Sequence, residues 1–250
     1  MYIIDFTKLK LSCEECSLHE LCLPRGLSGD DLDKLDEIVA RTQPIHKGDV
    51  LFRAGDKFNG IFSVRTGCMK LATSTEEGDE QIVGFYLPGE IIGLDGIEKE
   101  IHTCTAVALD TSSLCFIGFN HLTDVCKQIP TLSEQIFRVM GRELSHEHDL
   151  LLTVTKKHAD GRIATFLLSL SNRFKVLGYS ETEFRLPMSR SEIGNYLGLT
   201  FETVSRCLSK FQKQGLIEIN HKYITILDLE AMHAVCNETT SSENLRKSAS

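Results

Sequence analysis

The chain has 250 residues, of which 42% are hydrophobic, and its formal net charge at pH 7 is −8. This length and apolar content allow a substantial core and favour two domains. No apolar run is long enough to span a bilayer, and the N-terminus lacks the basic and apolar regions of a signal peptide, so we expect a cytoplasmic protein without a membrane partner. The chain has nine cysteines. Because we find no signal for export, we expect these thiols to be reduced, which favours metal binding or redox chemistry over disulfide bonds.

Three of these cysteines lie close together near the N-terminus. Cys13, Cys16 and Cys22 fall within the segment LSCEECSLHELCLPRG. Such spacing lets three thiolates converge on one metal centre, with a fourth ligand supplied from elsewhere in the chain. A structural zinc site and a redox-active CxxC pair are alternatives, although a thioredoxin-like pair would need a βαβ unit that this sequence does not predict. His19 is a further possible ligand. The spacing alone therefore admits an iron–sulfur site or a zinc site and does not distinguish them.

The next hundred residues have the pattern of a small β domain. Residues 32–38 predict a short amphipathic helix, and from Pro44 the hydrophobic period changes to two, with glycine-rich turns. The strands predicted between these turns cover residues 50–52, 61–64, 69–71, 82–86 and 113–117, the last of which contains Cys115. Many short strands at regular turn spacing indicate an antiparallel barrel or sandwich.

A long helix is predicted from Pro130 to about Lys157. Its apolar residues recur at alternating three- and four-residue steps, with a glutamate at the one position that breaks the pattern: Phe137, Met140, Leu144, Glu147, Leu151 and Val154. This spacing predicts a coiled-coil seam of nearly three heptads, and hence a homodimer. The alternative is a helix that packs only on its own β domain. In a parallel dimer the two Glu147 carboxylates would repel each other, so we expect a weak seam.

A second amphipathic helix, ending near Gly178, leads into two short helices around a tight turn. Ser189 and Glu192 form a predicted capping box at the start of the first short helix. Gly198 supplies the turn, and Thr200 caps the second short helix. The second helix has a predicted buried stripe of Phe201, Val204, Leu208 and Phe211.

The segment after these helices completes a recognisable module. Two alternating apolar runs at residues 217–219 and 223–226 flank a polar turn and predict a hairpin. Two short helices followed by a hairpin are the pattern of a winged helix-turn-helix. Residues 185–222 contain six cations and three glutamates, which leaves a local charge of +3 and −11 over the rest of the chain. A locally basic face on an acidic body favours oriented docking on DNA over indiscriminate coating.

The outward face of the second short helix has groups that can read DNA bases. It combines Glu202, Ser205, Arg206 and Ser209 near the helix start. Glutamate can accept a hydrogen bond from cytosine, and arginine can donate two to guanine in the major groove. A surface ion pair between Glu202 and Arg206 is the alternative. The hairpin that follows favours the DNA interpretation.

This order of β domain, long helix and winged helix-turn-helix resembles the cyclic-AMP receptor superfamily of bacterial transcription regulators, up to about residue 230. Within it, GNYLGLTFETVSRCLSKFQKQGLI and EGDEQI resemble the FNR branch, the fumarate-and-nitrate-reduction regulators that sense oxygen. The resemblance implies a [4Fe–4S] cluster held by three N-terminal cysteines and one from the β domain, and the matching positions are Cys13, Cys16, Cys22 and Cys115. The remaining cysteines match no functional position. We expect their side chains to be buried and to pack as small apolar groups, at Cys68, Cys104, Cys126, Cys207 and Cys236.

The same resemblance implies the DNA contacts. Glu202, Ser205 and Arg206 match the positions that read a palindrome of the form TTGAT-N4-ATCAA, whose half-sites lie a helical turn apart. We expect Ser191 and Thr200 to contact DNA beside them.

Three further expectations concern other partners. The loop around Gly78 is similar to a surface that contacts RNA polymerase. The phosphate-binding Arg-Ser pair of the cyclic-AMP branch is replaced by His102 and Thr103, so we do not expect a cyclic nucleotide. Arg25 and Phe201 depart from the family pattern, and the sequence does not predict their effect.

We therefore predict an α+β fold in five segments. They are an iron–sulfur-binding segment (1–29), an antiparallel β-roll sensor domain (30–129), a dimerisation helix (130–156), a winged helix-turn-helix domain (157–230) and a disordered tail (231–250). The predicted function is oxygen-responsive transcription regulation, as activator or repressor, by a homodimer that is not an enzyme. A regulator that uses zinc or a thiol switch is the nearest alternative, and an iron–sulfur electron carrier or enzyme is the other.

Overall fold

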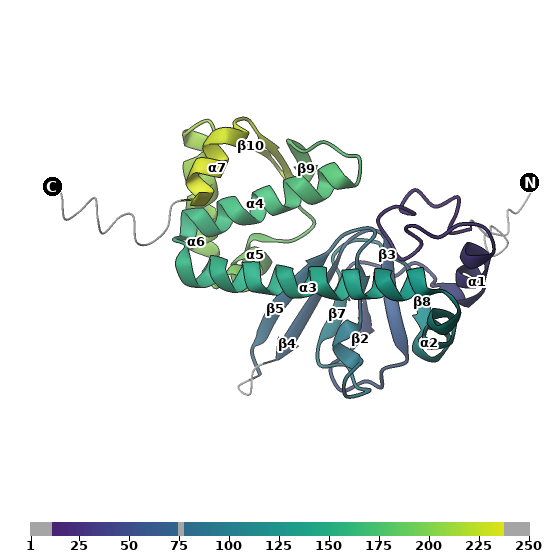
Figure 1. Ribbon diagram of the computed structural model, residues 1–250. Coiled ribbons are helices and arrows are strands. Elements are labelled where there is room, and N and C mark those ends of the chain that lie inside the picture. The colour runs from purple at the N-terminus through teal and green to yellow at the C-terminus, as the bar shows by residue number, and fades with distance from the viewer. Residues whose placement is uncertain (1–11, 75–77, 238–250) are drawn as a thin grey trace, which may run out of the picture. The chain divides into compact units, whose positions relative to one another are not determined.

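The structure is a computed structural model that describes residues 12–74 and 78–237 (Figure 1). The chain divides into two compact units. The first consists of residues up to 69 together with 85–141, and the second of residues 70–84 together with those from 142 onward. No helix in the described ranges is long and apolar enough to cross a lipid bilayer.

The predicted α+β architecture with an antiparallel β-roll is confirmed. The elements from the N-terminal side to the long helix are α1 (Asp30–Ile38), β1 (Val39–Arg41), β2 (Val50–Phe52), β3 (Gly60–Thr66), β4 (Met69–Ser74), β5 (Glu80–Tyr86), β6 (Ile91–Ile92), a 3-10 turn (Leu94–Gly96), β7 (Thr105–Ala108), β8 (Ser113–Gly118), α2 (Phe119–Gln128) and α3 (Pro130–Lys156). Every strand expected from the alternating pattern is present. Four further elements were not predicted, namely β1, β6, β7 and α2. The three strands have only two to four residues, and α2 buries only Leu122 and Val125, so each has a weak periodic signal.

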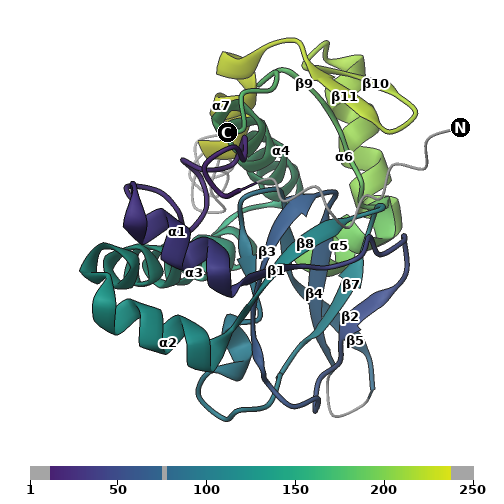
Figure 2. The same ribbon diagram turned by 90° about the vertical axis from the view of Figure 1, so that its right-hand side faces the viewer.

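The strands form two four-stranded sheets with the orders β1-β8-β3-β6 and β2-β7-β4-β5. In the first sheet, β8 runs antiparallel to both β1 and β3 (Figure 2). Cys115, Phe116 and Ile117 of β8 are paired with β1 on one side and with β3 on the other. Cys115 therefore sits inside the sheet and not at an edge.

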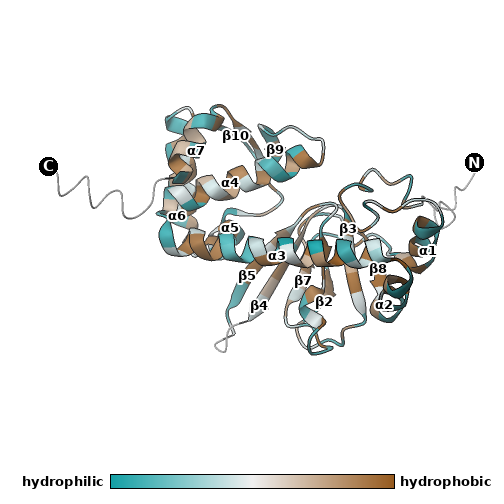
Figure 3. Ribbon diagram, in the orientation of Figure 1, coloured by the Kyte–Doolittle hydropathy of each residue, from teal (hydrophilic) through white to brown (hydrophobic). Residues whose placement is uncertain are grey.

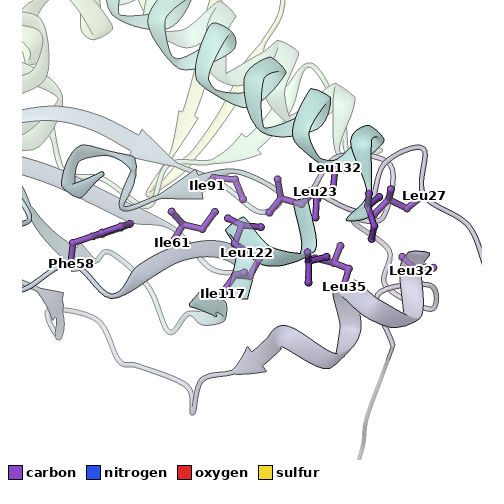
Figure 4. Packing of buried hydrophobic residues seen from close by; sticks show 12 residues of the cluster. Leu23, Leu27, Leu32, Leu35, Phe58, Ile61, Ile91, Ile117, Leu122 and Leu132 are labelled. Atoms are coloured by element: carbon purple, nitrogen blue, oxygen red, sulfur yellow. The ribbon is translucent and has the colours of Figure 1, made fainter. Parts of the chain in front are cut away.

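The core of the first unit brings the N-terminal segment, the sheet and the long helix together. Leu23 and Leu27 precede α1, Ile61 and Ile117 come from β3 and β8, and Leu132 comes from the first turn of α3. Figure 4 shows these side chains in one cluster. The N-terminal segment is thus packed into the same core as the start of α3.

The second unit contains the predicted winged helix-turn-helix. Its elements after α3 are α4 (Ala159–Val176), β9 (Glu183–Arg185), α5 (Arg190–Leu197), α6 (Phe201–Lys213), β10 (Ile217–Asn220), β11 (Tyr223–Ile226) and α7 (Leu229–Asn237). The sheet order is β10-β11-β9, so the predicted hairpin gains a third strand. Helix α4 packs against both α6 and α7 (Figure 1). The buried residues of α6 are Val204, Cys207, Leu208 and Phe211.

Two predictions about this unit are wrong. Phe201 is 49% exposed instead of buried, because the buried stripe of α6 is centred on Val204, Cys207 and Phe211 and leaves the first helical residue at its edge. The tail was expected to be disordered from residue 231, yet α7 is helical to Asn237 and buries Met232 completely. Residues 238–250 lie outside the described ranges.

Candidate metal centre and nucleic-acid interface

The cysteine segment, residues 12–27, is folded by a succession of tight turns. The backbone N–H of Cys16 donates to the carbonyl of Cys13 at 3.3 Å, and that of His19 donates to the carbonyl of Cys16 at 3.0 Å. Turns of the same kind continue to the end of the segment. Because each turn reverses the chain within a few residues, cysteines that are close in sequence can face a common centre.

Both ends of the cysteine segment are fixed to the rest of the first unit. The backbone N–H of Cys13 donates to the two carboxylate oxygens of Asp36 in α1, at 2.9 and 3.1 Å. At the other end, Leu23 and Leu27 are buried in the core cluster. The segment is therefore held by a charge-assisted hydrogen bond on one side and by apolar packing on the other.

The fourth cysteine lies on the central strand of the first sheet. Cys115 of β8 is paired in register with Arg41 of β1 and with Ser63 of β3. The Ser63 hydroxyl lies 3.0 Å from the Sγ atom of Cys22 and forms a hydrogen bond with it. This contact joins the cysteine segment to the strand beside Cys115.

All four predicted ligands line one cavity. Its other walls are mainly apolar, with a few polar side chains among them. The residues around it are Cys13, Cys16, Leu18, His19, Cys22, Leu23, Pro24, Leu35, Val39, Ser63, Arg65, Cys115 and Ile117. The structure therefore brings together three cysteines from the N-terminus and one from a strand about ninety residues later. His19 also lines the cavity, where its Nδ1 lies 3.3 Å from a carboxylate oxygen of Glu20.

The surroundings disfavour free thiolates in this cavity. Burial raises the pKa of the Cys22 thiol to about 11. Burial also raises the pKa of Cys13, and the hydrogen-bonded carboxylate of Asp36 adds to this effect. The pKa of Cys115 is raised by burial as well, although two neighbouring arginines oppose the shift. These three thiols are therefore protonated at neutral pH unless a bound cation compensates the charge of the thiolates.

The donor set fits a metal centre held by thiolates. Soft thiolate ligands bind both iron–sulfur clusters and zinc in proteins. The four cysteines around this cavity are therefore chemically suited to hold a [4Fe–4S] cluster, and the same donors suit a zinc ion.

Sequence reasoning missed the polar residues around the four cysteines. Ser63 and Arg65 lie two residues apart in β3 and so share one face of the strand. Arg41 and Asp36 approach from β1 and α1. A buried serine inside the apolar run Ile-Phe-Ser-Val was the one signal available. The expectation for the other five cysteines holds for two, since Cys68 and Cys207 are buried while the remaining three are half-buried.

The helix-turn-helix is specified by its caps and by two glycines. The Ser189 hydroxyl accepts from the backbone N–H of Glu192, whose carboxylate accepts from the backbone N–H of Ser189, so the predicted capping box is present. Gly198 ends α5 with φ of 63°, in the left-handed region that favours glycine. Gly194 allows α5 to lie close to the backbone of the following turn, because a Cβ at this position would lie 2.6 Å from the carbonyl oxygen of Leu199.

The predicted base-reading face of α6 is accessible. Glu202 and Arg206 are exposed, and no ion pair within the described residues joins them. The alternative interpretation of this face, a surface ion pair, is therefore not supported. Ser205 is half-buried and accepts a hydrogen bond from Nη1 of Arg190 in α5, at 3.3 Å. Arg190 was not predicted as a site residue.

The two remaining residues expected at DNA have different surroundings. Ser191 is exposed in the first turn of α5. Thr200 is exposed as well, but its hydroxyl caps α6 by accepting from the backbone N–H of Thr203 at 3.2 Å. Its role in the helix is therefore structural, whatever further contact it makes.

The long helix α3 leaves its heptad positions open. Phe137 is 72% exposed, and Met140, Leu144 and Leu151 are also exposed. Apolar and polar bands alternate along this helix in Figure 3. Glu147 is exposed between Leu144 and Leu151, whereas Val154 is half-buried. An apolar stripe of this size on a single chain indicates a contact surface.

Two further predicted positions can be located. The ring of His102 stacks on Phe52 with centroids 3.7 Å apart, and its Nδ1 lies 3.3 Å from a carboxylate oxygen of Asp95. Thr103 donates its backbone N–H to the same carboxylate group. Gly78 is exposed, with φ of 88° and open space around it, next to residues 75–77, which lie outside the described ranges.

Comparison with protein families identifies both parts of the chain. Residues 42–129 match the cyclic nucleotide-binding domain, and residues 161–235 match the Crp-like helix-turn-helix domain. Similar proteins include the transcriptional activator protein Anr of Pseudomonas aeruginosa, which is 50% identical over 216 residues that cover 86% of this chain and 88% of the relative. The fumarate and nitrate reduction regulatory protein of Salmonella typhimurium is 44% identical over 229 residues, which cover 92% of each chain.

Solved structures show the same architecture. FixK2 from Bradyrhizobium japonicum aligns with a TM-score of 0.74 at 27% identity and covers 80% of this chain and 98% of its own. A CooA mutant from Carboxydothermus hydrogenoformans aligns with a TM-score of 0.64 at 20% identity, covering 80% of this chain and 89% of its own. The second likeness concerns the fold alone.

Proposed function

Because the chain belongs to the FNR branch of the Crp/Fnr family of transcription regulators, we propose that it is an oxygen sensor whose DNA binding depends on a [4Fe–4S] cluster. The protein is a DNA-binding transcription regulator and not an enzyme. The finer proposal rests on one observation, the gathering of Cys13, Cys16, Cys22 and Cys115 around a single cavity.

The four cysteines would hold the cluster in the absence of oxygen. The cluster supplies oxygen-sensitive iron–thiolate bonds that cross-link the cysteine segment to β8. Within the described residues, the hydrogen bond between Cys22 and Ser63 joins the cysteine segment to β3, the strand beside β8. Losing the four bonds therefore leaves the segment held mainly by Asp36 and by its buried leucines.

The core offers a route from the cysteine segment to α3. Leu23 and Leu27 of the segment lie in the same buried cluster as Leu132 of α3, and Ile136 and Val139 pack against that cluster. A shift of the segment would change the packing of these residues. We infer that the intact site holds the first half of α3 in the position that pairing needs, and that oxygen releases it.

Pairing would use the exposed stripe of α3. Phe137, Met140, Leu144 and Leu151 supply apolar knobs, and Glu147 interrupts them with a charge. Two such carboxylates at a dimer seam repel, so the dimer forms only when the cluster-bound packing offsets that repulsion. A homodimer then presents two α6 helices to one palindrome.

The DNA partner would be a palindrome of the TTGAT-N4-ATCAA type. Glu202 and Arg206 are exposed on α6 and are not paired with each other, so both can contact base edges. Ser205 lies between them on the same face, and the exposed Ser191 can reach the sugar-phosphate backbone of the DNA. The open loop at Gly78 is the surface we assign to RNA polymerase.

The proposal is tested by operator binding without oxygen and after exposure to air. The native protein, purified anaerobically, should contain iron and inorganic sulfide and should bind the palindrome with higher affinity before exposure than after it. Cys22→Ser should lack the cluster and bind weakly under both conditions. Cys104→Ser is the matched control, because Cys104 is half-buried but does not line the cavity, and it should behave as the native protein does.

Two outcomes would contradict the proposal. An anaerobic preparation that contains zinc in place of iron would favour the alternative of a zinc-dependent regulator. Equal operator affinity in the native protein and in Cys22→Ser would disconnect the cavity from DNA binding altogether.

A further inference from the structure

The hydrogen bond between Arg190 and Ser205 connects the two helices of the helix-turn-helix at the predicted base-reading face. Arg190 is the first residue of α5, and Ser205 lies in the second turn of α6. The two helices are neighbours in the second unit (Figure 2). Nη1 of Arg190 donates to Oγ of Ser205 at 3.3 Å.

The polarity of this hydrogen bond is fixed by chemistry. A guanidinium group has only donors, so the serine oxygen must be the acceptor. The hydroxyl hydrogen of Ser205 therefore stays available for a different acceptor. The adjacent positive charge also makes the hydroxyl a stronger donor and repels an approaching N–H donor.

The surroundings make Ser205 the principal polar partner of Arg190. Among residues 12–74 and 78–237, Arg190 has no carboxylate in ion-pair contact and makes no other side-chain hydrogen bond. It is half-buried, as is Ser205. A guanidinium in this setting orients the serine more effectively than a fully solvated one would.

We propose that Arg190 is a positioning residue. It orients Ser205 as a hydrogen-bond donor toward DNA and so determines which base Ser205 recognises. In the major groove, thymine O4, guanine O6 and N7 and adenine N7 are acceptors, whereas the cytosine N4 amino group is a donor. Ser205 held in this way favours an acceptor edge over the cytosine amino group, because one of its two lone pairs is already used and the adjacent guanidinium is positively charged. The inference rests on the proposed function, because it requires α6 to lie in the major groove.

The alternative role for Arg190 is a simple phosphate contact. Loss of a phosphate contact lowers affinity equally for all sequences and reduces the salt dependence of binding. A positioning role instead changes discrimination at one base pair. The two roles therefore differ in a measurable way.

The experiment compares anaerobic binding of the reconstituted protein to operators in which each base pair of one half-site is replaced in turn. Ser205→Ala identifies the base pair that Ser205 reads, because discrimination at that pair falls by about 2- to 10-fold. Arg190→Ala should reduce discrimination at the same pair by a similar factor. The double variant should discriminate no less than either single variant, because the arginine acts through the serine.

Two further variants separate charge from geometry. Arg190→Lys keeps the charge but loses the fixed fork of donors, so it should keep the salt dependence and lose part of the discrimination. Lys213→Ala removes an exposed cation at the end of α6, the helix that contains Ser205, and it should leave discrimination at every base pair unchanged. Thermal unfolding followed by circular dichroism verifies that each variant is folded.

The results that would overturn the inference are distinct. If Arg190→Ala weakens binding uniformly while Ser205→Ala alone alters one base pair, Arg190 is a phosphate contact and the inference is wrong. If neither variant alters discrimination, Ser205 reads no base and the inference is wrong as well. A native protein that binds all operators alike contradicts the proposed function itself, and this inference with it.

Discussion

The chemistry of the candidate site is set by a few side chains whose surroundings change their ordinary behaviour. Cys22 is the clearest case, because burial raises the pKa of its thiol from 9.0 to about 11. Ser63, 3% exposed, forms a hydrogen bond with the Cys22 sulfur. Both properties belong to the folded protein and can be measured without assuming a bound cofactor.

The pKa of Cys22 predicts slow alkylation in the metal-free protein. Since the thiolate is the nucleophile, the rate of reaction with iodoacetamide should rise with pH along a curve whose midpoint lies near 11. The same residue in urea should titrate near the ordinary value, because unfolding removes the burial. Peptide mass spectrometry gives the two profiles, and coincident midpoints would show that the thiol is not shielded.

Ser63→Ala should make the reconstituted protein more sensitive to air. A hydrogen bond donated to a ligand sulfur withdraws electron density and raises the reduction potential of an iron–sulfur cluster. Removing it should lower the midpoint potential and speed the loss of visible absorbance in air. Ser112→Ala is the control, since Ser112 is also fully buried but does not line the cavity. Equal potentials in the native protein and in Ser63→Ala would refute the assignment.

At the scale of elements, helix caps and close backbone contacts determine the structure of the DNA-binding module. Gly194→Ala should destabilise it by about 1–3 kcal/mol, because the added Cβ would meet the carbonyl oxygen of Leu199 at 2.6 Å. Gly141→Ala is the matched control in α3, where nothing lies within 4 Å of the added atom. That change should stabilise the protein by about 0.5–1 kcal/mol. Urea denaturation followed by circular dichroism measures both, and equal shifts would exclude the steric explanation.

The elements with strong local signals were predictable from sequence. The capping box at Ser189, the turn at Gly198 and the alternation in β3 and β5 each depend on neighbours within a few residues. Helix α7 also had a local signal, since Asp228 caps it by accepting from the backbone N–H of Ala231 at 2.9 Å. The polar composition that follows this helix favours disorder and so hides that signal.

The contacts that depend on long-range packing were not predictable. The pairing of Ser63 with Cys115 follows from the strand order β1-β8-β3-β6, which no local pattern encodes. The Arg190–Ser205 hydrogen bond likewise depends on the crossing of two helices. The four ligand positions came from resemblance to a family, since spacing alone left zinc and iron–sulfur equally open. The structure adds the common cavity and its polar surroundings.

At the scale of the whole molecule, we propose that the exposed stripe on α3 controls pairing of two chains. Glu147→Ala should increase the fraction of dimer in air, because it removes the charge repulsion predicted at the seam. Asp149→Ala removes the same charge from an exposed position off the seam and should leave the dimer fraction unchanged. Analytical ultracentrifugation measures both. If the two variants behave alike, net charge and not the seam controls pairing.

The open apolar stripe on α3 also has a consequence for gene dosage. If a second copy covers this stripe, as proposed, pairing obeys mass action, so at low occupancy doubling the number of chains raises the number of pairs about fourfold. The response of target promoters would then depend steeply on how much of the protein a cell makes, even at constant oxygen. Modest changes in expression or turnover would shift the oxygen tension at which those promoters respond.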